Sequence, residues 1–193
     1  MTNKYKEMKT SFVFLADGFE EVEAMTSVDV MRRAGMPVVT VSINPGLEVT
    51  GAHGVPVLAD SLFGDNDYSD AEWLVLPGGM PGATNLAAHE ALCALLQDHD
   101  DKDGRIGAIC ASPSVVLAPL GILQGRDAVC YPGMEAPVEA VSWGRESVAV
   151  SDNVVTGNGP AAAAPFALTM VAESLGREAA EQVAAGMLLT LRG

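Results

Sequence analysis

The sequence predicts an α/β fold in which a mostly parallel sheet is covered by helices on both faces. Short apolar, β-branched runs alternate with helical patterns along the chain, and these runs are continuous, as in strands buried on both faces. The 193 residues, 49% of them hydrophobic and 19% charged, are enough for the core of one domain. We therefore expect a tail over residues 1–10 and a single domain over residues 11–193.

The first third of the chain predicts a strand-helix-strand unit followed by a hairpin. The expected elements are a strand over 11–16, a helix over 20–34, a strand over 38–43 and a small β-hairpin over 46–58. Gly35 follows the helical pattern and Pro37 precedes the second strand, as in a crossover that returns to a parallel neighbour. The stretch 60–72 is acidic, and we expect it to be a solvated loop.

The remainder predicts further strand-helix units. The first unit consists of a strand over 73–76, a turn over 77–82 and an amphipathic helix over 85–98. The second consists of a strand over 106–109 and a helical stretch over 110–117. Short strands near 128–131, 148–150 and 154–156 and two C-terminal helices follow.

Charge and cysteine content narrow the class of protein. Acidic side chains number 25 against 11 basic ones, a net charge of -14 without any basic stripe, so we expect neither nucleic acid nor membrane as a partner. An odd number of cysteines, three, argues against a secreted disulfide framework and favours the cytoplasm. We expect no signal peptide, because only a short apolar run follows the lysines of the N-terminus. Glycines and prolines in the uncharged stretches 106–125 and 153–172 argue against membrane spans.

Functional residues are expected directly after the strands, since ligands of an open parallel sheet bind beyond the carboxyl ends of its strands. Cys110 is the most informative of them, because it lies between a buried strand and a helix, the context of a nucleophile elbow. The helix N-terminus should lower the pKa of its thiol from about 8.5 into the range of roughly 3.5–7.5. The alternative is a buried structural cysteine, the usual role of a cysteine without such a context.

Two glycines follow the neighbouring strand. Gly78 and Gly79 allow a close backbone approach, so the N–H groups of Gly79 and Ala111 could bind an oxyanion. The alternative is a tight turn that requires positive φ.

Three glutamates open the first helix, where carboxylates also complement the helix dipole. Helical spacing directs at least one of Glu20, Glu21 and Glu23 toward the crevice, and a buried carboxylic acid there would be neutral and hydrogen-bonded to the thiolate. The pattern does not choose among the three.

The histidines offer no obvious general base. His53 falls in the hairpin, His89 and His99 flank a surface helix, and we expect all three to be solvated. The sequence has no zinc-binding pattern, phosphate loop or dinucleotide fingerprint, so we expect no metal and no cofactor.

Five motifs, in order, resemble the ThiJ/PfpI superfamily and, within it, the branch of the Parkinson-linked protein deglycase and its bacterial relatives. They are Ala16-Asp-Gly-Phe-Glu-Glu-Val-Glu23, Asp29-Val-Met-Arg-Arg-Ala-Gly35, Leu76-Pro-Gly-Gly79, Gly107-Ala-Ile-Cys-Ala-Ser-Pro113 and Thr156-Gly-Asn-Gly-Pro160. The similarity extends from Phe12 to Leu189. It implies a flavodoxin-like fold, related to that of class I glutamine amidotransferases, and a homodimer.

The resemblance also assigns site residues. It implies that Cys110 is the reactive cysteine and that Glu23 is the acid bonded to it. Gly78, Gly79, Ala111, Tyr131, Gly159 and Pro160 would form the oxyanion and substrate-binding region, and His53 would approach the active site of a partner chain. Protease-like members have a histidine where this chain has Ala111, and the deglycase branch often has one where this chain has the pair Tyr131-Pro132.

Three functions remain open on this basis. The leading hypothesis is a cofactor-independent glyoxalase or deglycase that acts on methylglyoxal or its adducts through Cys110 and Glu23. The second is a redox-responsive protective or regulatory protein in which Cys110 is oxidised and Glu23 stabilises the product. The weakest is an amidase or peptidase-like hydrolase, because no histidine follows Cys110.

Overall fold

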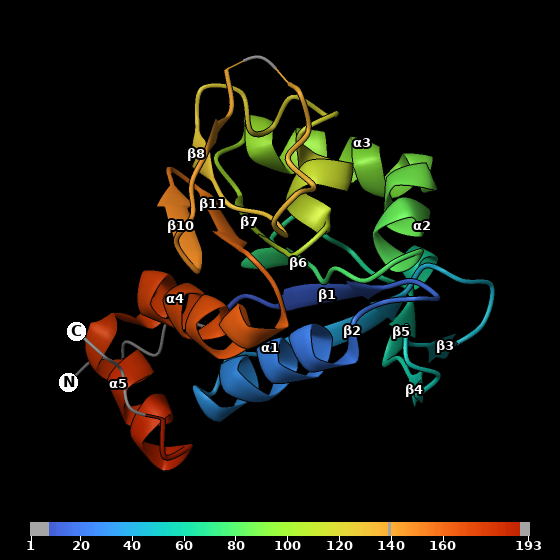
Figure 1. Cartoon of the computed structure of the whole chain (residues 1–193). Coiled ribbons are helices and arrows are strands. Elements are labelled where there is room, and N and C mark those ends of the chain that lie inside the picture. The colour runs from blue at the N-terminus through green and yellow to red at the C-terminus, as the bar shows by residue number, and fades with distance from the viewer. Residues whose placement is uncertain (1–7, 139, 190–193) are drawn as a thin grey trace.

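A sheet of seven strands forms the centre of the computed structural model, which describes residues 8–138 and 140–189 (Figure 1). In spatial order the strands are β10 (Val148–Ser151), β11 (Val154–Gly157), β7 (Arg105–Ile109), β6 (Trp73–Leu76), β1 (Ser11–Leu15), β2 (Val38–Ser42) and β5 (Ser61–Leu62). Neighbours are parallel except for β10, which is antiparallel to β11. The predicted mostly parallel sheet is therefore confirmed. Most of the predicted tail over 1–10 lies outside the described residues.

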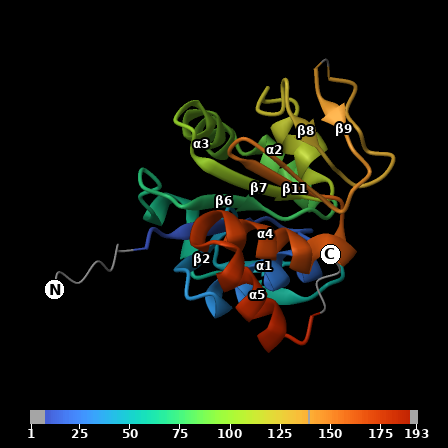
Figure 2. The ribbon, with the colours of Figure 1, turned by 90° about the vertical axis from the view of Figure 1, so that its left-hand side faces the viewer.

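Helices cover both faces of this sheet (Figures 1 and 2). One face carries α1 (Glu21–Arg33), α4 (Ala163–Leu175) and α5 (Arg177–Gly186); the other carries α2 (Gly82–Ala88), α3 (Glu90–Asp101) and the π-helical turn η2 (Pro113–Leu117). Alternate side chains of β1 supply the two layers of the core: Val13 and Leu15 pack with the first group, and Phe12 and Phe14 with the second.

Two small strand pairs lie outside the main sheet. The strands β3 (Glu48–Thr50) and β4 (Pro56–Leu58) form the predicted hairpin, with Val49 opposite Val57. The strands β8 (Asp127–Ala128) and β9 (Ser142–Trp143) pair in parallel. The strand expected near 128–131 is therefore shorter and begins earlier, and Cys130 lies after it.

The acidic stretch 60–72 is only in part the solvated loop that the sequence predicts. Residues 61–65 form β5 at the sheet edge and a 3-10 turn, η1 (Phe63–Asp65), whereas residues 66–72 are irregular and include the exposed Asp67 and Asp70. The ring of Tyr68 packs edge-on against Phe12, with 4.7 Å between centroids, and Phe63 lies 6.0 Å from Phe14. Two aromatic side chains thus hold this stretch against the core despite its charge.

The structure corrects two further predictions, and both corrections involve histidines. The helix expected over 85–98 is divided into α2 and α3 at His89, whose Nδ1 accepts the Leu92 N–H at 3.1 Å and caps α3. His99 is buried instead of solvated, with Nε2 3.2 Å from the Arg105 carbonyl oxygen. A Cβ at position 104 would lie 2.4 Å from His99 Cε1, so Gly104 provides the space for this ring.

Candidate active site

Cys110 lies at the carboxyl end of β7, on a turn with unusual backbone geometry. Its φ is 63°, in the left-handed region that residues other than glycine rarely adopt. Two hydrogen bonds hold the turn: the Cys110 N–H donates to the Gly157 carbonyl oxygen, and the Cys110 carbonyl accepts from the Tyr131 N–H, both at 2.8 Å. The side chain is only 8% exposed. This strained and fixed backbone is the geometry expected of a nucleophile elbow.

The three glutamates of α1 have different roles. Glu20 caps the helix by accepting the Glu23 N–H at 2.8 Å, and Glu21 binds His53. Glu23 is fully buried, and its Oε2 accepts the Gly78 N–H at 2.7 Å. Among the described residues its Oε1 has no hydrogen-bond partner, and its carboxyl lies close enough to Cys110 for the two groups to shift each other's pKa. The structure thus selects the glutamate that the pattern alone left undecided.

Gly78 and Gly79 make the contact between Glu23 and Cys110 possible. A Cβ on Gly78 would lie 2.6 Å from Cys110 Cβ and 2.8 Å from Glu23 Oε2. Gly79 has a φ of 89°, and a Cβ there would meet the Glu20 nitrogen at 2.5 Å. Both positions therefore require glycine for the close approach of three chain segments.

Substitution of Gly78 by Ala should consequently destabilise the fold and separate the thiol from the acid. We expect the free energy of unfolding to fall by about 1–3 kcal/mol, as for other overpacked sites. Gly46→Ala is the matched control, because a Cβ at that position would have no atom within 4 Å. Urea unfolding of both variants measures the difference, and equal stability would contradict the described packing.

Burial and charge set the protonation of the Cys110 and Glu23 pair. Burial raises the pKa of the Glu23 carboxyl to about 7. Burial and the ionised Glu23 carboxylate raise the pKa of the Cys110 thiol to about 12, against the opposing effect of the Gly79 and Ala111 N–H groups. The prediction that the helix N-terminus lowers the pKa of this thiol is therefore wrong. The segment that follows is one π-helical turn, and it does not offset burial beside a carboxylate.

The two groups titrate as a unit. The first proton leaves the pair near pH 7, and the second leaves only near pH 12, because it would place two negative charges side by side in a buried site. Between these values the pair carries one negative charge and one proton. That proton lies mainly on the Cys110 sulfur, because the pKa of the carboxyl is far below that of the thiol.

Of the remaining predicted residues, Tyr131 and Gly159 lie beside the turn that holds Cys110. Tyr131 is bound through its N–H to Cys110, and its ring faces Gly159, where a Cβ would lie 3.5 Å from Tyr131 Cδ2. Pro160 begins the short turn η3 (Pro160–Ala162) that leads into α4. The hydroxyphenyl group is 47% exposed, so it lies at the surface of the site.

His53 lies away from the thiol within one chain. Its Nδ1 lies 2.7 Å from Glu21 Oε2, and this carboxylate raises the pKa of the exposed imidazole. Donor atoms of Glu20, Glu21 and His53 lie within 4.8 Å of one another, as in a metal site. Each of these side chains is already engaged, in the helix cap or in the imidazole-carboxylate pair, so the geometry does not favour a metal there.

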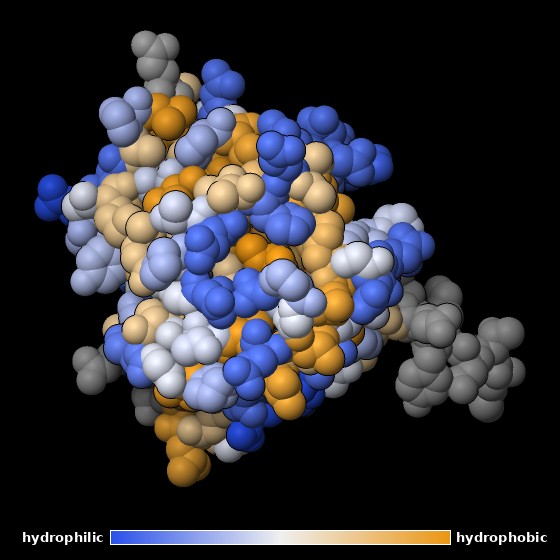
Figure 3. Space-filling view, turned by 90° about the vertical axis from the view of Figure 1, so that its right-hand side faces the viewer, coloured by the Kyte–Doolittle hydropathy of each residue, from blue (hydrophilic) through white to orange (hydrophobic). Residues whose placement is uncertain are grey.

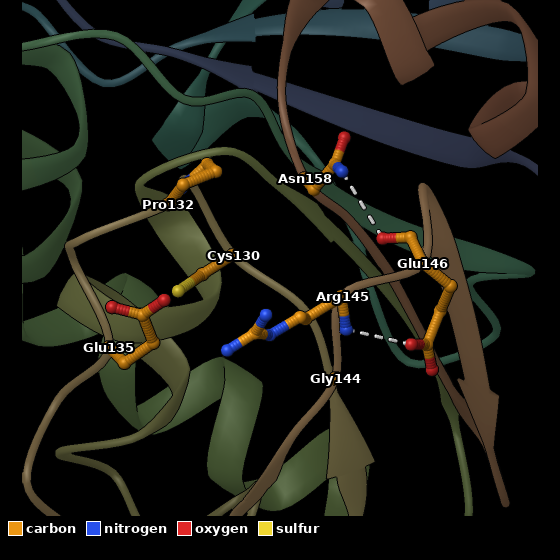
Figure 4. A pocket seen from close by; sticks show the side chains of 7 residues that line it. All are labelled: Cys130, Pro132, Glu135, Gly144, Arg145, Glu146 and Asn158. Atoms are coloured by element: carbon orange, nitrogen blue, oxygen red, sulfur yellow. Dashed lines mark hydrogen bonds between the residues drawn. The ribbon is translucent and has the colours of Figure 1, made fainter.

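Sequence reasoning missed a cavity that begins beside this site. It has a volume of about 380 Å³ and is lined by Cys130, Pro132, Glu135, Gly144, Arg145, Glu146 and Asn158 (Figure 4). Most of these residues come from the irregular segment between β8 and β10, where no periodic pattern indicates which side chains face inward.

None of the helices in residues 8–138 and 140–189 is both long enough and apolar enough to cross a membrane.

Comparisons with known proteins bear on the family and the fold of this chain. The model of the DJ-1/PfpI family matches residues 9–173. The Parkinson disease protein 7 homolog of Danio rerio is 36% identical over 185 residues, which cover 94% of this chain and 97% of that protein. The glutathione-independent glyoxalase DJR-1.2 of Caenorhabditis elegans is 34% identical over 155 residues, or 79% of this chain and 81% of that protein.

A solved structure and two longer relatives complete the comparison. The oxidized DJ-1 of Toxoplasma gondii superposes with a TM-score of 0.90 at 37% identity, covering 95% of this chain and 100% of the other. The DJ-1 homologs B and A of Arabidopsis thaliana are 35% and 34% identical, and the chain spans 40% and 47% of their lengths.

Proposed function

Because the chain belongs to the DJ-1/PfpI family, we propose that it is a cysteine-dependent enzyme of the glyoxalase or deglycase type that acts on methylglyoxal or its adducts. The observation that carries the proposal is the burial of the Glu23 carboxyl beside Cys110, where each group shifts the pKa of the other. The printed name of the Caenorhabditis elegans relative supports the same class of reaction.

The reaction begins with the attack of Cys110 on the aldehyde. As the sulfur bonds to the aldehyde carbon, the proton shared by the pair passes to the carbonyl oxygen and gives a hemithioacetal. The N–H groups of Gly79 and Ala111, which stabilise negative charge at the sulfur, lie close enough to stabilise the developing oxyanion. This step requires no external base, because the ionised Glu23 carboxylate lies beside the thiol and can take its proton.

Glu23 then moves a proton between adjacent carbons. Its carboxylate takes the proton from the former aldehyde carbon and returns it to the neighbouring carbon, which converts the hemithioacetal of methylglyoxal into a lactoyl thioester. One carbon is oxidised and its neighbour is reduced, so no external oxidant or reductant is needed. Water releases lactate and restores the thiol. A carboxyl with a pKa near 7 suits both directions of transfer at neutral pH.

The direct test is lactate formation from methylglyoxal in the absence of glutathione. We expect turnover by the wild type. The same pair would also serve the redox alternative, in which Glu23 donates to oxygens added to Cys110. A protein that forms no lactate, but gains two oxygens on Cys110 alone after mild peroxide, would favour that alternative and contradict the enzymatic proposal.

We further propose that the active form is a homodimer in which His53 contributes to the partner's site. Large apolar side chains are exposed on α1 and in the hairpin region, namely Val22, Leu47, Val55 and Leu58 at 52%, 42%, 50% and 75%. Figure 3 shows the side of the molecule that carries the hairpin, where apolar surface lies among hydrophilic groups. Sedimentation analysis gives the number of chains directly, and a stable monomer with full activity would overturn the proposal.

A further inference from the structure

One peptide unit of the loop after β6 connects the acid of α1 to the turn that holds Cys110. The carbonyl and the N–H of a trans peptide unit lie in one plane and point in opposite directions, so fixing one of them fixes the other. The Gly78 N–H donates to Glu23 Oε2 at 2.7 Å. The Pro77 carbonyl, which belongs to the same peptide unit, accepts the Ser112 hydroxyl at 2.5 Å. The hydroxyl of Ser112 therefore sets the direction of the N–H that binds Glu23.

The next two carbonyl groups of this loop are held by backbone donors. The Gly78 carbonyl accepts the Glu20 N–H and the Gly79 carbonyl accepts the Ala83 N–H, both at 2.9 Å. Of the three bonds, the one to Pro77 comes from a side chain. It can therefore be removed by a substitution that leaves the backbone donors in place.

Ser112 is itself held in a fixed position. It lies two residues after Cys110, directly before η2, and it is fully buried. A buried hydroxyl without a partner is unfavourable, so its bond to Pro77 is a lasting part of the fold. The bond ties the loop that carries the Gly79 N–H to the turn that carries the Ala111 N–H.

We propose that Ser112 is a positioning residue that keeps the peptide unit of Pro77 and Gly78 in the orientation in which its N–H binds Glu23. Without the hydroxyl, the buried Pro77 carbonyl loses its donor, and the peptide unit is free to turn. The chemistry itself belongs to Cys110 and Glu23. The effect of Ser112 on turnover rests on the proposed function, whereas its effect on the ionisation of Glu23 does not.

The loss of this orientation has a defined sign. Burial raises the pKa of Glu23, and the hydrogen bond from the Gly78 N–H opposes that effect. A peptide unit that turns away removes the opposing hydrogen bond, so the pKa of Glu23 should rise further above 7. The other groups that act on this pKa are Cys110 and, at the start of the same helix, Glu20.

The remaining elements around Glu23 bring no further charge to it. The strands β1 and β6 contain no titratable side chain. In α4, which packs against α1 and is described throughout, the one titratable side chain is the exposed Glu173. In the hairpin region, His53 binds Glu21 instead. A change in the pKa of Glu23 on substitution of Ser112 would therefore report the Gly78 hydrogen bond.

An NMR titration of the Glu23 carboxyl carbon in the full-length protein tests the proposal without requiring turnover. The resonance of Glu23 is the one that is missing from Glu23→Gln. We expect a midpoint near pH 7 in the wild type and a higher midpoint in Ser112→Ala. Ser112→Thr keeps the hydroxyl and should have the wild-type midpoint. Ser114→Ala is the matched control, because it removes a buried hydroxyl two residues further on, whose acceptor is the Met134 carbonyl.

The lactate assay measures the consequence for the reaction. Ser112→Ala should lower kcat at least about tenfold with little change in KM, because a misaligned acid slows proton transfer and leaves substrate binding intact. Ser114→Ala should retain the wild-type kcat. If the wild type forms no lactate, the proposed function fails, and the NMR midpoints still decide the role of Ser112. Equal midpoints in the wild type and Ser112→Ala, or a midpoint of Ser112→Thr as high as that of Ser112→Ala, would overturn the proposal.

Discussion

Replacement of Cys110 by Ser is expected to lower the rate of lactate formation from methylglyoxal by at least about 10³-fold, because a serine hydroxyl in this position lacks the nucleophilicity of sulfur. Glu23→Gln should cost roughly 10²–10⁴-fold, the usual contribution of a general acid-base group. Gln retains the acceptor for the Gly78 N–H, so the loss would report the missing proton carrier and not a displaced loop.

Two matched variants control this result. Cys93→Ser changes a half-buried cysteine of α3, and Glu173→Gln changes an exposed glutamate near the end of α4. Both should retain the wild-type rate in the same lactate assay. Wild-type rates in Cys110→Ser or in Glu23→Gln would remove the residue concerned from the mechanism.

The same substitution of Glu23 is expected to stabilise the folded protein at neutral and alkaline pH. The pKa of this carboxyl rises from 4.5 to about 7 on folding, so the folded state prefers the protonated form. The contribution of this raised pKa to the free energy of unfolding is fully present below pH 4.5 and is lost as the pH rises through 7. At pH 8, Glu23→Gln should therefore exceed the wild type by about 3 kcal/mol in free energy of unfolding, at about 1.4 kcal/mol for each pKa unit.

Urea unfolding at pH 4.5 and pH 8 measures this effect. The gap between Glu23→Gln and wild type should be small at the lower pH and large at the higher one, whereas Glu173→Gln should show no such change. A gap that is the same at both values would contradict the raised pKa of Glu23. The expected gain in stability at the expense of activity is characteristic of a group held in an unfavourable environment for its function.

The sequence alone predicted the elements that apolar runs define and missed those that depend on tertiary contacts. Strands such as β1 and β7 are buried throughout, so their composition identifies them. The edge strand β5 has only two residues, and it is held by aromatic packing of Phe63 and Tyr68 that no local pattern reveals. His89 breaks a continuous helical pattern because its ring caps the next helix, a role unusual for histidine.

The candidate site likewise has features that the sequence predicts and features that depend on tertiary contacts. The position of Cys110 after a buried strand and before a helical segment could be predicted from the sequence, because strand ends converge at one edge of a parallel sheet. The choice of Glu23 among three glutamates required the structure or a family resemblance, since all three open the same helix. The protonation of the pair could not be predicted, because it depends on burial and on the charge that the two groups impose on each other. The cavity beside Cys130 was missed because most of its lining comes from a segment without regular structure.

The central claim is that Cys110 and Glu23 share one proton above pH 7. The rate of alkylation of Cys110 by iodoacetamide, followed at this residue by mass spectrometry from pH 5 to pH 11, tests it most directly. We expect the wild-type rate to keep rising to the upper end of this range, because the thiol loses its proton only near pH 12, and the midpoint of Glu23→Gln to lie at lower pH, because this variant lacks the carboxylate that raises the pKa of the thiol. Coincident midpoints in both proteins, near the value of about 8.5 for an ordinary thiol, would contradict the claim.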